Sequence, residues 1–507
     1  RRMRERRAAA FRGAFVKGRY AVIKQTNAAG DSVTTEYDLA GRPIAVTDAN
    51  GNTSYTEYDR AGRVIKSISP FDDNGDGETK TYYDKNSNVV KTSVKKSANE
   101  YQSEEYKYDI MGNLVAEIQN DGTSDLVTQY EYDSANRLTK RITGLSEYSE
   151  TPEGGSATTY TYGNNGFLWK ETNASNESVM YEYYDYVGNV KQAVESYAWR
   201  YYTYGPYGLT QERRYGRGET IKEYTYNDLG MLTGTKNSNV NLNEMSHLNG
   251  GEEVRTDTEE SYTYDVFGRM VTHKTNDGRV QYYGYDKNSN VTSYRLGSNQ
   301  SITYEYNELN QLTKLTNNGI ITTYEYDANG NLTKRRADNG MMTQYSYNKA
   351  GLITNTVNTA SGSTIGTGVY VYYLNGAKFN EIGMTRLENG MRLRQQTYRY
   401  DGAGRLIENY VGDNYADAVH NQYTYDLRGN RTSSINMLSE TGEKTEYEYD
   451  AGDHLLSRQT TDGGVLQSKT YYSYDERGNL SGEQTRTYES EGLAGSTAEQ
   501  AGLSNDA

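Results

Sequence analysis

One acidic stretch has the residue types and spacing of a cation site. Asp72, Asn74 and Asp76 stand at the first, third and fifth positions of the run, a glycine follows at the sixth, and Glu78 comes next. Oxygen ligands at alternate positions, with a glycine at the sharp turn, are typical of the front half of an EF-hand-like calcium loop. The twelfth position is Tyr83 and not a bidentate glutamate. The sequence therefore allows a calcium site formed by Asp72, Asn74, Asp76 and Glu78, or a plain acidic hairpin loop.

The other polar residues form no recognisable reactive motif. The four histidines, His247, His273, His420 and His454, fall in different parts of the chain without a metal-like neighbour. The absence of cysteine excludes disulfides and thiolate metal sites. No Gly-x-Ser-x-Gly elbow occurs. The glycine-rich run 362–368 lacks the lysine of a phosphate-binding loop and is predicted to be a flexible connector. We therefore assign no catalytic residue and no bound cofactor besides the calcium option, and expect no enzyme.

Repeated aspartates are the most conspicuous carboxylates. A glycoside hydrolase needs two carboxylates in different environments, whereas these are equivalent to one another. Each lies in the same place, usually just before x-x-Gly, which is where an aspartate starts a tight turn. They are therefore interpreted as turn residues: Asp38, Asp59, Asp109, Asp133, Asp265, Asp286, Asp327, Asp401, Asp426, Asp450 and Asp475.

These aspartates belong to one repeated motif, aromatic-x-Tyr-Asp-x-x-Gly-[Asn/Arg]-apolar. Clear copies are YTEYDRAGRVI around Asp59 and YEYDANGNLT around Asp327, and degenerate ones include YTYGNNGFLW around Gly163. About nineteen copies follow each other at intervals of roughly 20 to 30 residues, which is the signature of a repeat architecture.

Each copy predicts a β-hairpin. The two tyrosines lie two residues apart and so on the same face of a strand. The aspartate begins the turn, and the glycine three residues later takes the left-handed conformation. Asn136 and Asn310 replace that glycine, and asparagine tolerates positive φ better than most residues. A second turn signal, Asn-Gly or Asp-Gly, often ends the next strand, as at Asn50-Gly51 and Asp121-Gly122.

Chained hairpins predict an all-β fold. The 53 tyrosines and 51 glycines, against 4 prolines, suit half-buried strands with frequent reversals. A sheet of about forty strands cannot stay flat, so we expect tandem β-hairpins in one long antiparallel sheet coiled into a spiral shell or large barrel. We expect a basic N-terminal segment at 1–30, the repeat shell at 31–485 and a polar tail at 486–507. The polar stretches 234–260 and 144–157 are predicted to be surface loops.

Charge and hydropathy limit the classes of partner that the chain could bind. The net charge of −14, with Glu and Lys interspersed, argues against nucleic acid. No apolar run is long enough to form a membrane-spanning helix, and the N-terminus lacks the apolar core of a signal peptide. Some of the many tyrosines should be exposed, and exposed rings can stack on sugars.

The Tyr-Asp-x-x-Gly-[Asn/Arg] array, over about 34–482, resembles the YD-repeat or Rhs-repeat family. That family includes bacterial Rhs proteins, wall-associated proteins, the B and C components of insecticidal toxin complexes, and teneurins. The resemblance implies a spiral β-shell around a variable C-terminal polypeptide, often a toxin. The C-terminal core that plugs such shells is not recognisable, so the chain is expected to be a fragment of a longer protein.

The resemblance gives two expectations of function. The first is a non-catalytic scaffold of a secreted or cell-surface protein, which encloses or presents a C-terminal effector in bacterial competition or toxin delivery. The alternative is a surface adhesin whose tyrosine-rich face binds glycans or wall polymers.

Overall fold

The computed structural model describes residues 10–16, 19–73, 75–195, 198–216, 218–241, 254–298, 300–387, 390–413, 419–474 and 480–488. Within these ranges the chain forms forty β-strands and no helix. The all-β prediction is therefore confirmed. None of the described residues forms a helix with the length and hydropathy that crossing a bilayer requires.

The first twenty strands are β1 (Ala10–Val16), β2 (Arg19–Thr26), β3 (Ser32–Tyr37), β4 (Pro43–Thr47), β5 (Thr53–Tyr58), β6 (Val64–Asp72), β7 (Gly75–Tyr83), β8 (Val89–Ser97), β9 (Glu100–Tyr108) and β10 (Leu114–Asn120), followed by β11 (Asp125–Tyr132), β12 (Leu138–Leu145), β13 (Ser156–Tyr162), β14 (Leu168–Thr172), β15 (Ser178–Tyr184), β16 (Val190–Glu195), β17 (Ala198–Gly205), β18 (Gly208–Tyr215), β19 (Glu219–Tyr226) and β20 (Leu232–Asn241).

The remaining strands are β21 (Val254–Tyr264), β22 (Met270–Lys274), β23 (Val280–Tyr285), β24 (Val291–Leu296), β25 (Gln300–Tyr306), β26 (Leu312–Asn317), β27 (Ile320–Tyr326), β28 (Leu332–Ala337), β29 (Met341–Tyr347) and β30 (Ile353–Ala360), followed by β31 (Ser363–Tyr372), β32 (Lys378–Leu387), β33 (Gly390–Tyr400), β34 (Leu406–Asp413), β35 (Val419–Tyr425), β36 (Arg431–Asn436), β37 (Lys444–Tyr449), β38 (Leu455–Asp462), β39 (Val465–Tyr474) and β40 (Leu480–Thr487).

The strands form one antiparallel meander, in which each strand pairs with the next along the chain, as β5 does with β6 and β6 with β7. Alternate connections of a meander lie on the same edge of the sheet. The turns that start at the motif aspartate join odd strands to the following even strands, so all of them lie on one edge, which we call the Tyr-Asp edge. The other hairpin turns form the opposite edge.

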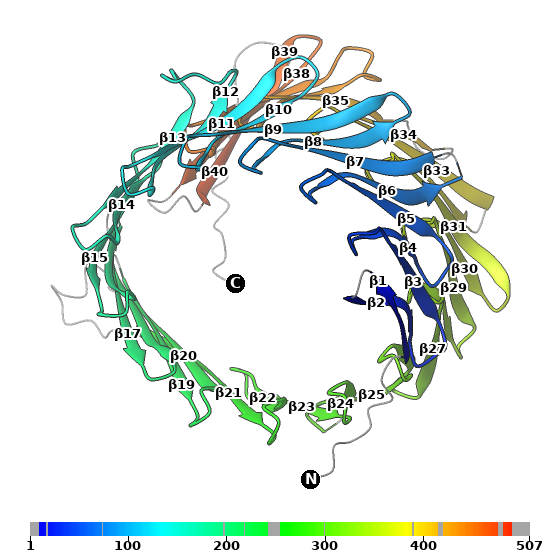
Figure 1. Ribbon diagram of the computed structural model, residues 1–507. Coiled ribbons are helices and arrows are strands. Elements are labelled where there is room, and N and C mark those ends of the chain that lie inside the picture. The colour runs from blue at the N-terminus through cyan, green and yellow to red at the C-terminus, as the bar shows by residue number, and fades with distance from the viewer. Residues whose placement is uncertain are drawn as a thin grey trace.

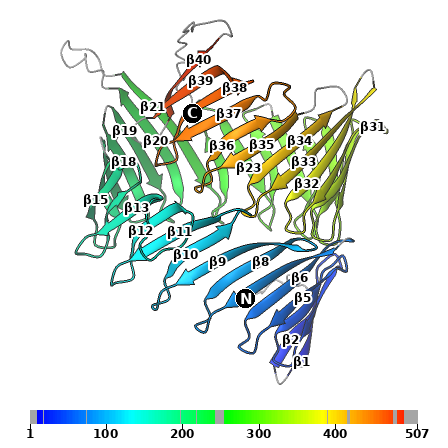
Figure 2. The ribbon, with the colours of Figure 1, turned by 90° about the horizontal axis from the view of Figure 1, so that it is seen from above.

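The sheet winds into a spiral. Seen along its axis the strands form a ring (Figure 1), and from the side the C-terminal strands pass over the N-terminal ones (Figure 2). The turn between β27 and β28 contacts the turn between β4 and β5, which lies 23 strands earlier in the chain. We call the strands from β1 to β23 the first coil and those from β24 to β40 the second coil. The predicted coiling of the sheet is confirmed.

Few side chains are fully buried, as expected for a sheet one layer thick. One cluster of buried apolar residues, Ala116, Val127, Ile142 and Leu145, lies beneath Tyr148 of the β12–β13 loop. Gln129 holds this loop through hydrogen bonds to the backbone of Ser149. The predicted loop at 144–157 is therefore present, and it packs against the sheet.

Two predictions about irregular segments are wrong. Residues 234–241 and 254–260 lie in β20 and β21, which pair from Gly234–Ser261 to Asn241–Val254, while 242–253 fall outside the described residues. The glycine-rich run after Gly362 forms β31 and is not a connector. In both places backbone pairing with a neighbouring strand stabilises a sequence whose polar or glycine-rich composition signals a loop. The strands β1, β2 and β40 extend the sheet to both sides of 31–485, and the domain boundaries stay a prediction.

Candidate functional site

The motif aspartate organises its turn through its carboxylate. In the β3–β4 turn, Oδ1 of Asp38 accepts hydrogen bonds from the N–H groups of Ala40 (2.8 Å) and Arg42 (3.0 Å), and Oδ2 accepts one from Nε of Arg42 (2.7 Å). The N–H of Gly41 donates to the carbonyl of Asp38, and the N–H of Asp38 donates to the carbonyl of Arg42. The backbone and then the side chain of Arg42 hold the pKa of Asp38 below its usual value. The interpretation of these aspartates as turn residues is confirmed within the described residues, and Asp475 lies outside them.

The residue after the glycine links one turn to the next. The Arg42 guanidinium donates to the carbonyl of Asp59 in the following Tyr-Asp turn (3.2 Å) and lies 4.7 Å from the centre of the Tyr58 ring. This explains why the motif prefers arginine or asparagine there, since both can reach the aspartate and the neighbouring turn. The same arginine-to-carbonyl bond joins Arg63 to Asp84, Arg269 to Asp286 and Arg405 to Asp426.

The tyrosine before the aspartate joins each hairpin to the one before it. Its hydroxyl donates to the backbone carbonyl of the apolar residue at the start of the preceding even strand. The bond recurs along the sheet: Tyr58 to Pro43, Tyr83 to Val64, Tyr132 to Leu114, Tyr162 to Leu138, Tyr184 to Leu168, Tyr226 to Leu209, Tyr264 to Leu232, Tyr285 to Met270, Tyr306 to Val291, Tyr326 to Leu312, Tyr347 to Leu332, Tyr372 to Ile353, Tyr425 to Leu406 and Tyr474 to Leu455.

The positive-φ position of the turn is as predicted at the glycines, with φ of 84° at Gly41, and at Asn136 (59°) and Asn310 (62°). Sequence reasoning missed Ser87 (75°) and Ser289 (71°), which occupy this position in two further turns. The signal was available, because both follow Asp-Lys-Asn and precede Asn-Val. The hydroxyl of Ser87 accepts a bond from Arg63 of the preceding Tyr-Asp turn.

The Tyr-Asp turns of the second coil contact the opposite edge of the first, and we call this contact the seam. Three backbone bonds of about 3 Å recur at one motif position. The residue after the turn-starting residue donates its N–H to a carbonyl of the first coil. These bonds are Lys349 to Phe71, Leu374 to Lys96 and Gly402 to Asp121.

Polar side chains complete the seam. Asn329 Oδ1 accepts from the N–H groups of Ala49 and Asn50, and its amide donates to Asp48. Further along, Arg405 forms a half-buried ion pair with Asp121 at 3.0 Å. Removing one member of such a pair leaves a partly desolvated charge, so the pair favours one alignment of the coils.

Close backbone approach also shapes the seam. A Cβ at Gly402 would lie 2.2 Å from the carbonyl oxygen of Asn120 in the first coil. A Cβ at Gly452 would lie 2.6 Å from Oγ of Ser175. At Gly402 only glycine permits this proximity, because a backbone oxygen cannot move aside, whereas the Ser175 side chain could rotate away from a Cβ at Gly452. A hollow of about 300 Å³ remains in the seam, lined by Glu104, Glu117 and Arg141 from the first coil and by Arg405 and Arg428 from the second. 

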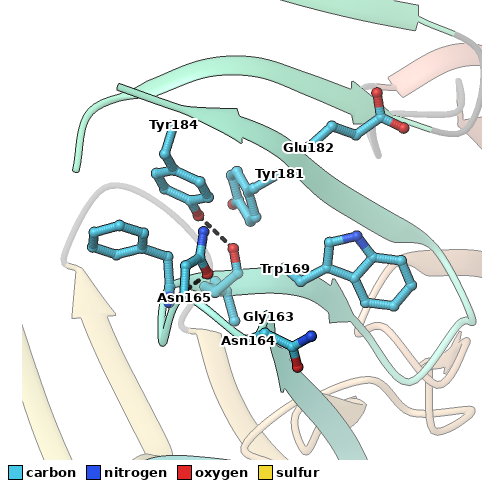
Figure 3. A pocket seen from close by; sticks show the side chains of 9 residues that line it. Gly163, Asn164, Asn165, Trp169, Tyr181, Glu182 and Tyr184 are labelled. Atoms are coloured by element: carbon cyan, nitrogen blue, oxygen red, sulfur yellow. Dashed lines mark hydrogen bonds between the residues drawn. The ribbon is translucent and has the colours of Figure 1, made fainter. Parts of the chain in front are cut away.

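A shallow hollow of about 280 Å³ lies on the degenerate repeat where Gly163 replaces the aspartate. Figure 3 shows Tyr184, Tyr181 and Trp169 around it. The Tyr184 ring stacks on Phe167 at 4.8 Å, and its hydroxyl donates to the Leu168 carbonyl. Glu182 is the one carboxylate among the lining residues. The hollow therefore has no acid–base pair for catalysis.

The residues of the predicted calcium loop lie in the β6–β7 hairpin. Oδ1 of Asp72 accepts from the N–H of Gly75 (3.1 Å), and Asp76 pairs with Pro70 across the strands. Glu78 lies on β7, where its carboxylate binds the Tyr101 hydroxyl and the ammonium groups of two lysines. These contacts lower the pKa of Glu78 to about 2.

The two lysines are Lys66 (3.1 Å) and Lys80 (2.9 Å). Asn74 lies outside the described residues, and the described ones bring no three acidic or histidine side chains together in a metal-like group. The calcium site stays a prediction.

Three histidines pair with carboxylates. His273 contacts Glu260 at 3.0 Å, His420 contacts Glu408 at 2.5 Å, and His454 contacts Asp450 at 2.9 Å. His247 falls outside the described residues. The three pairs lie in different repeats, and each is an ordinary side-chain contact of a strand or turn.

Two family models match parts of the chain. The Teneurin YD-shell model matches residues 252–364, and the RHS Repeat model matches 21–53 and 37–79. No curated protein sequence matches the chain.

The fold resembles that of a toxin component. A structure of the Photorhabdus luminescens Tc holotoxin pore with the mutation TccC3-D651A is similar over 90% of this chain, with a TM-score of 0.62 and 13% identity. This chain spans 27% of that one. Crystal structures of TcdB2-TccC3-Cdc42 and TcdB2-TccC3 match 93% of this chain and 40% and 38% of theirs, at 9% and 10% identity, with TM-scores of 0.37 and 0.35. The chain is thus a tandem array of β-hairpin repeats, which are similar to the Teneurin YD-shell and RHS Repeat families in the matched segments.

Proposed function

We propose that this chain is a non-catalytic section of shell wall in a secreted or cell-surface Rhs-type protein. The wall would enclose or present an effector polypeptide in bacterial competition or toxin delivery. The fold likeness to a Tc holotoxin component supports a scaffold of this kind. Because the chain spans about a quarter of that component, the effector and the role of the whole protein belong to the proposal.

The seam is the observation that carries the proposal. A single sheet can wind without its coils touching, and then gaps between coils would let solvent and proteases through. Here the β27–β28, β29–β30, β31–β32 and β33–β34 turns each bond to a turn 23 strands earlier. Successive coils are therefore joined by repeated bonds, as a continuous wall requires.

The construction of the wall also favours a passive role. The carboxylates at the Tyr-Asp edge are held by turn N–H groups and by arginine or asparagine, as with Asp59, Ala61 and Arg63. A carboxylate whose oxygens are occupied in this way is not free to act as a general base.

Protease protection of an attached polypeptide tests enclosure. An unstructured, trypsin-sensitive reporter is fused after Ala507, and its digestion is compared with that of the free reporter. We expect much slower cleavage in the fusion, with the shell itself intact on the gel. The same reporter fusion carrying Asp121→Asn and Asn329→Ala, which remove bonds of the seam, should be cleaved faster than the parent fusion. Equal cleavage of fused and free reporter, with an intact shell, would contradict the proposal.

Glycan binding is a second candidate, favoured by one group of exposed aromatics. Trp199 pairs with Tyr215, and Tyr183 lies two strands from Tyr201 through Gln192, all on one face of β15–β18. Each of the four rings is more than two-fifths exposed. Sugar rings stack on such exposed aromatic faces. A glycan array probed with the chain and with Trp199→Ala tests this, and an array without any binding excludes it.

A further inference from the structure

One patch of exposed aromatic side chains lies on neighbouring strands of a single face of the sheet. Its members are Tyr183 on β15 (61% exposed), Trp199 (44%) and Tyr201 (43%) on β17, and Tyr215 (45%) on β18. We call these four side chains the aromatic platform. Aromatic side chains that are exposed singly are ordinary, whereas several gathered on one face indicate a binding surface.

The strand register gives one row of the platform a period of two strands. In this row Tyr183 pairs with Gln192 of β16, Gln192 with Tyr201, Tyr201 with Arg213 of β18, and Arg213 with Ile221 of β19. Because paired residues share a face, the row alternates between a ring or apolar side chain and a polar side chain. Neighbouring strands lie about 4.8 Å apart, so the two rings of the row are roughly 10 Å apart.

A second row runs beside the first and widens the platform. Val194 of β16 pairs with Trp199, and Trp199 pairs with Tyr215. Trp199 and Tyr201 are two residues apart on β17, so the two rows lie about 7 Å apart. A surface of this shape is broad and open, and it suits an extended polymer lying across the strands better than a small molecule, which binds in a concave site.

The charges in and beside the two rows balance each other. Nε of Arg213 donates to the carboxylate of Glu219 on β19, and the amide of Gln192 donates to Glu182 at 2.8 Å. Lys170 of β14, which continues the second row, offsets the charge of Glu182. An anionic polymer needs an excess of basic groups, and these rows have none, so the platform favours an uncharged ligand.

The period of the platform matches one class of uncharged polymer. In an extended β-1,4-linked glycan, each sugar unit is about as long as the separation of two neighbouring strands. Successive units are turned over, so every second unit presents the same face. Units above Tyr183 and Tyr201 can therefore stack on the two rings in the same way, while the unit between them meets the Gln192 amide. An α-1,4-linked chain curls into a helix and does not keep this period.

We propose that the aromatic platform binds an extended, uncharged β-1,4-linked glycan that lies across the strands from β15 to β19. Tyr183 and Tyr201 stack on alternate sugar units, and Gln192 and Arg213 hydrogen-bond the hydroxyl groups of the units between and beyond them. The inference rests on the second candidate function, glycan binding, and narrows it to one class of ligand. It is independent of the proposed enclosure of an effector.

Tryptophan fluorescence of the full chain tests the proposal, because Trp199 belongs to the platform. The chain is titrated with β-1,4-linked oligosaccharides of glucose and of N-acetylglucosamine. We expect the affinity to rise from the disaccharide to the hexasaccharide, because a longer chain covers more of the row. The α-1,4-linked glucose hexasaccharide, which differs from its β-linked counterpart in linkage alone, should bind about ten-fold more weakly or less.

Variants locate the site. Tyr183→Ala and Tyr201→Ala should each weaken binding about ten-fold, whereas Tyr201→Phe keeps the ring and should bind like the parent. Tyr55→Ala is the matched control, because Tyr55 is a 51% exposed tyrosine on β5, ten strands before β15. It should bind like the parent, and circular dichroism should be unchanged in every variant.

The outcomes separate this inference from glycan binding in general. Equal affinity for the α-linked and β-linked hexasaccharides would overturn the inference and leave glycan binding in place. The same holds if both alanine variants on the platform bind like the parent, because the glycan then binds elsewhere on the chain. If no oligosaccharide binds and a glycan array shows no binding either, both the inference and the second candidate function are excluded.

Discussion

The hydroxyl of Tyr326 donates a 2.8 Å hydrogen bond to the backbone carbonyl of Leu312, one hairpin earlier in the sheet. The pairing of β26 with β27 ends at Lys314–Thr323, so the ladder does not reach this carbonyl. The tyrosine side chain takes its place and keeps adjacent hairpins together near the Tyr-Asp edge. Burial raises the pKa of Tyr326, which keeps the donor protonated well above neutral pH.

Replacing Tyr326 by phenylalanine should therefore weaken the sheet locally. The ring and its packing remain, while the half-buried Leu312 carbonyl loses its donor, at a cost of about 1 kcal/mol. Because repeat arrays open in sections, the measurement is amide hydrogen exchange in β26 and β27 and not a single melting temperature. Tyr324→Phe, two residues earlier, is the control, since its hydroxyl forms no hydrogen bond with the described residues. Equal exchange in the two variants would contradict the role given to the hydroxyl.

The turn glycines should be sensitive for a purely conformational reason. Gly112 has φ of 89°, and an added Cβ would meet nothing within 4 Å. Gly112→Ala should therefore cost about 1 kcal/mol through backbone strain alone. Gly383 in β32 has no positive φ, and an added Cβ would lie 3.9 Å from the Arg394 carbonyl oxygen, an ordinary van der Waals distance, so Gly383→Ala should be neutral or stabilising. Urea denaturation monitored by circular dichroism compares the two variants, and a cost at Gly383 as large as at Gly112 would contradict this explanation.

The repeat unit could be read from the sequence because its determinants are local. Tyr-x-Tyr fixes the face of the strand, and Asp-x-x-Gly fixes the turn, so both were predictable without knowledge of the neighbours. The positive φ of Ser87 and Ser289 was not predicted, because serine seldom adopts positive φ. The long hairpin of β20 and β21 was predicted to be a loop, because its two strands are polar and are stabilised by pairing with each other.

The seam could not be predicted, because it depends on how many strands complete one coil. That number follows from the accumulated twist and curvature of the whole sheet. A change of one strand would move each Tyr-Asp turn out of line with the opposite-edge turn that it contacts, and would separate Asn329 from Asp48. Asn86 occupies the same position in a Tyr-Asp turn of the first coil, so its place in the motif does not mark Asn329 as a seam residue.

That pair of asparagines gives a test of the seam. Asn329→Ala removes the acceptor for the N–H groups of Ala49 and Asn50, so these two amides should exchange faster. The β27–β28 hairpin should keep its own exchange rates, because its Asp327–Asn331 bonds are untouched. Asn86→Ala should leave the exchange of Ala49 and Asn50 as in the parent. Protection of the two amides that persists in Asn329→Ala would show that the coils are not joined there.

The predicted calcium loop is tested by calorimetry. If Asp72 and Asp76 supply ligands, titration of the parent with Ca²⁺ releases or absorbs heat that the Asp72→Ala/Asp76→Ala variant lacks. Glu78 is engaged by Lys66 and Lys80, so the affinity should be weak and should fall as salt is added. Flat traces for both proteins would exclude the site.

Stability should fall steeply in acid, because many similar carboxylates titrate together. Bonds from Arg42 hold the pKa of Asp38 below its usual value, those from Arg63 do so for Asp59, and the contacts of Glu78 lower its pKa to about 2. A group whose pKa is lower in the folded state stabilises that state fully above its unfolded pKa, and the contribution is lost as pH falls toward the folded value.

The structure should therefore be insensitive to pH from neutrality to about pH 5, and should lose stability progressively below about pH 4. Urea midpoints measured from pH 7 down to pH 2 show this. Asp59→Asn should be less stable than the parent at pH 7, because it loses the ion pair with Arg63. The two proteins should converge in acid, where Asp59 of the parent is protonated as well. A constant difference between them over the whole range would mean that the charge of the turn aspartate does not stabilise the fold.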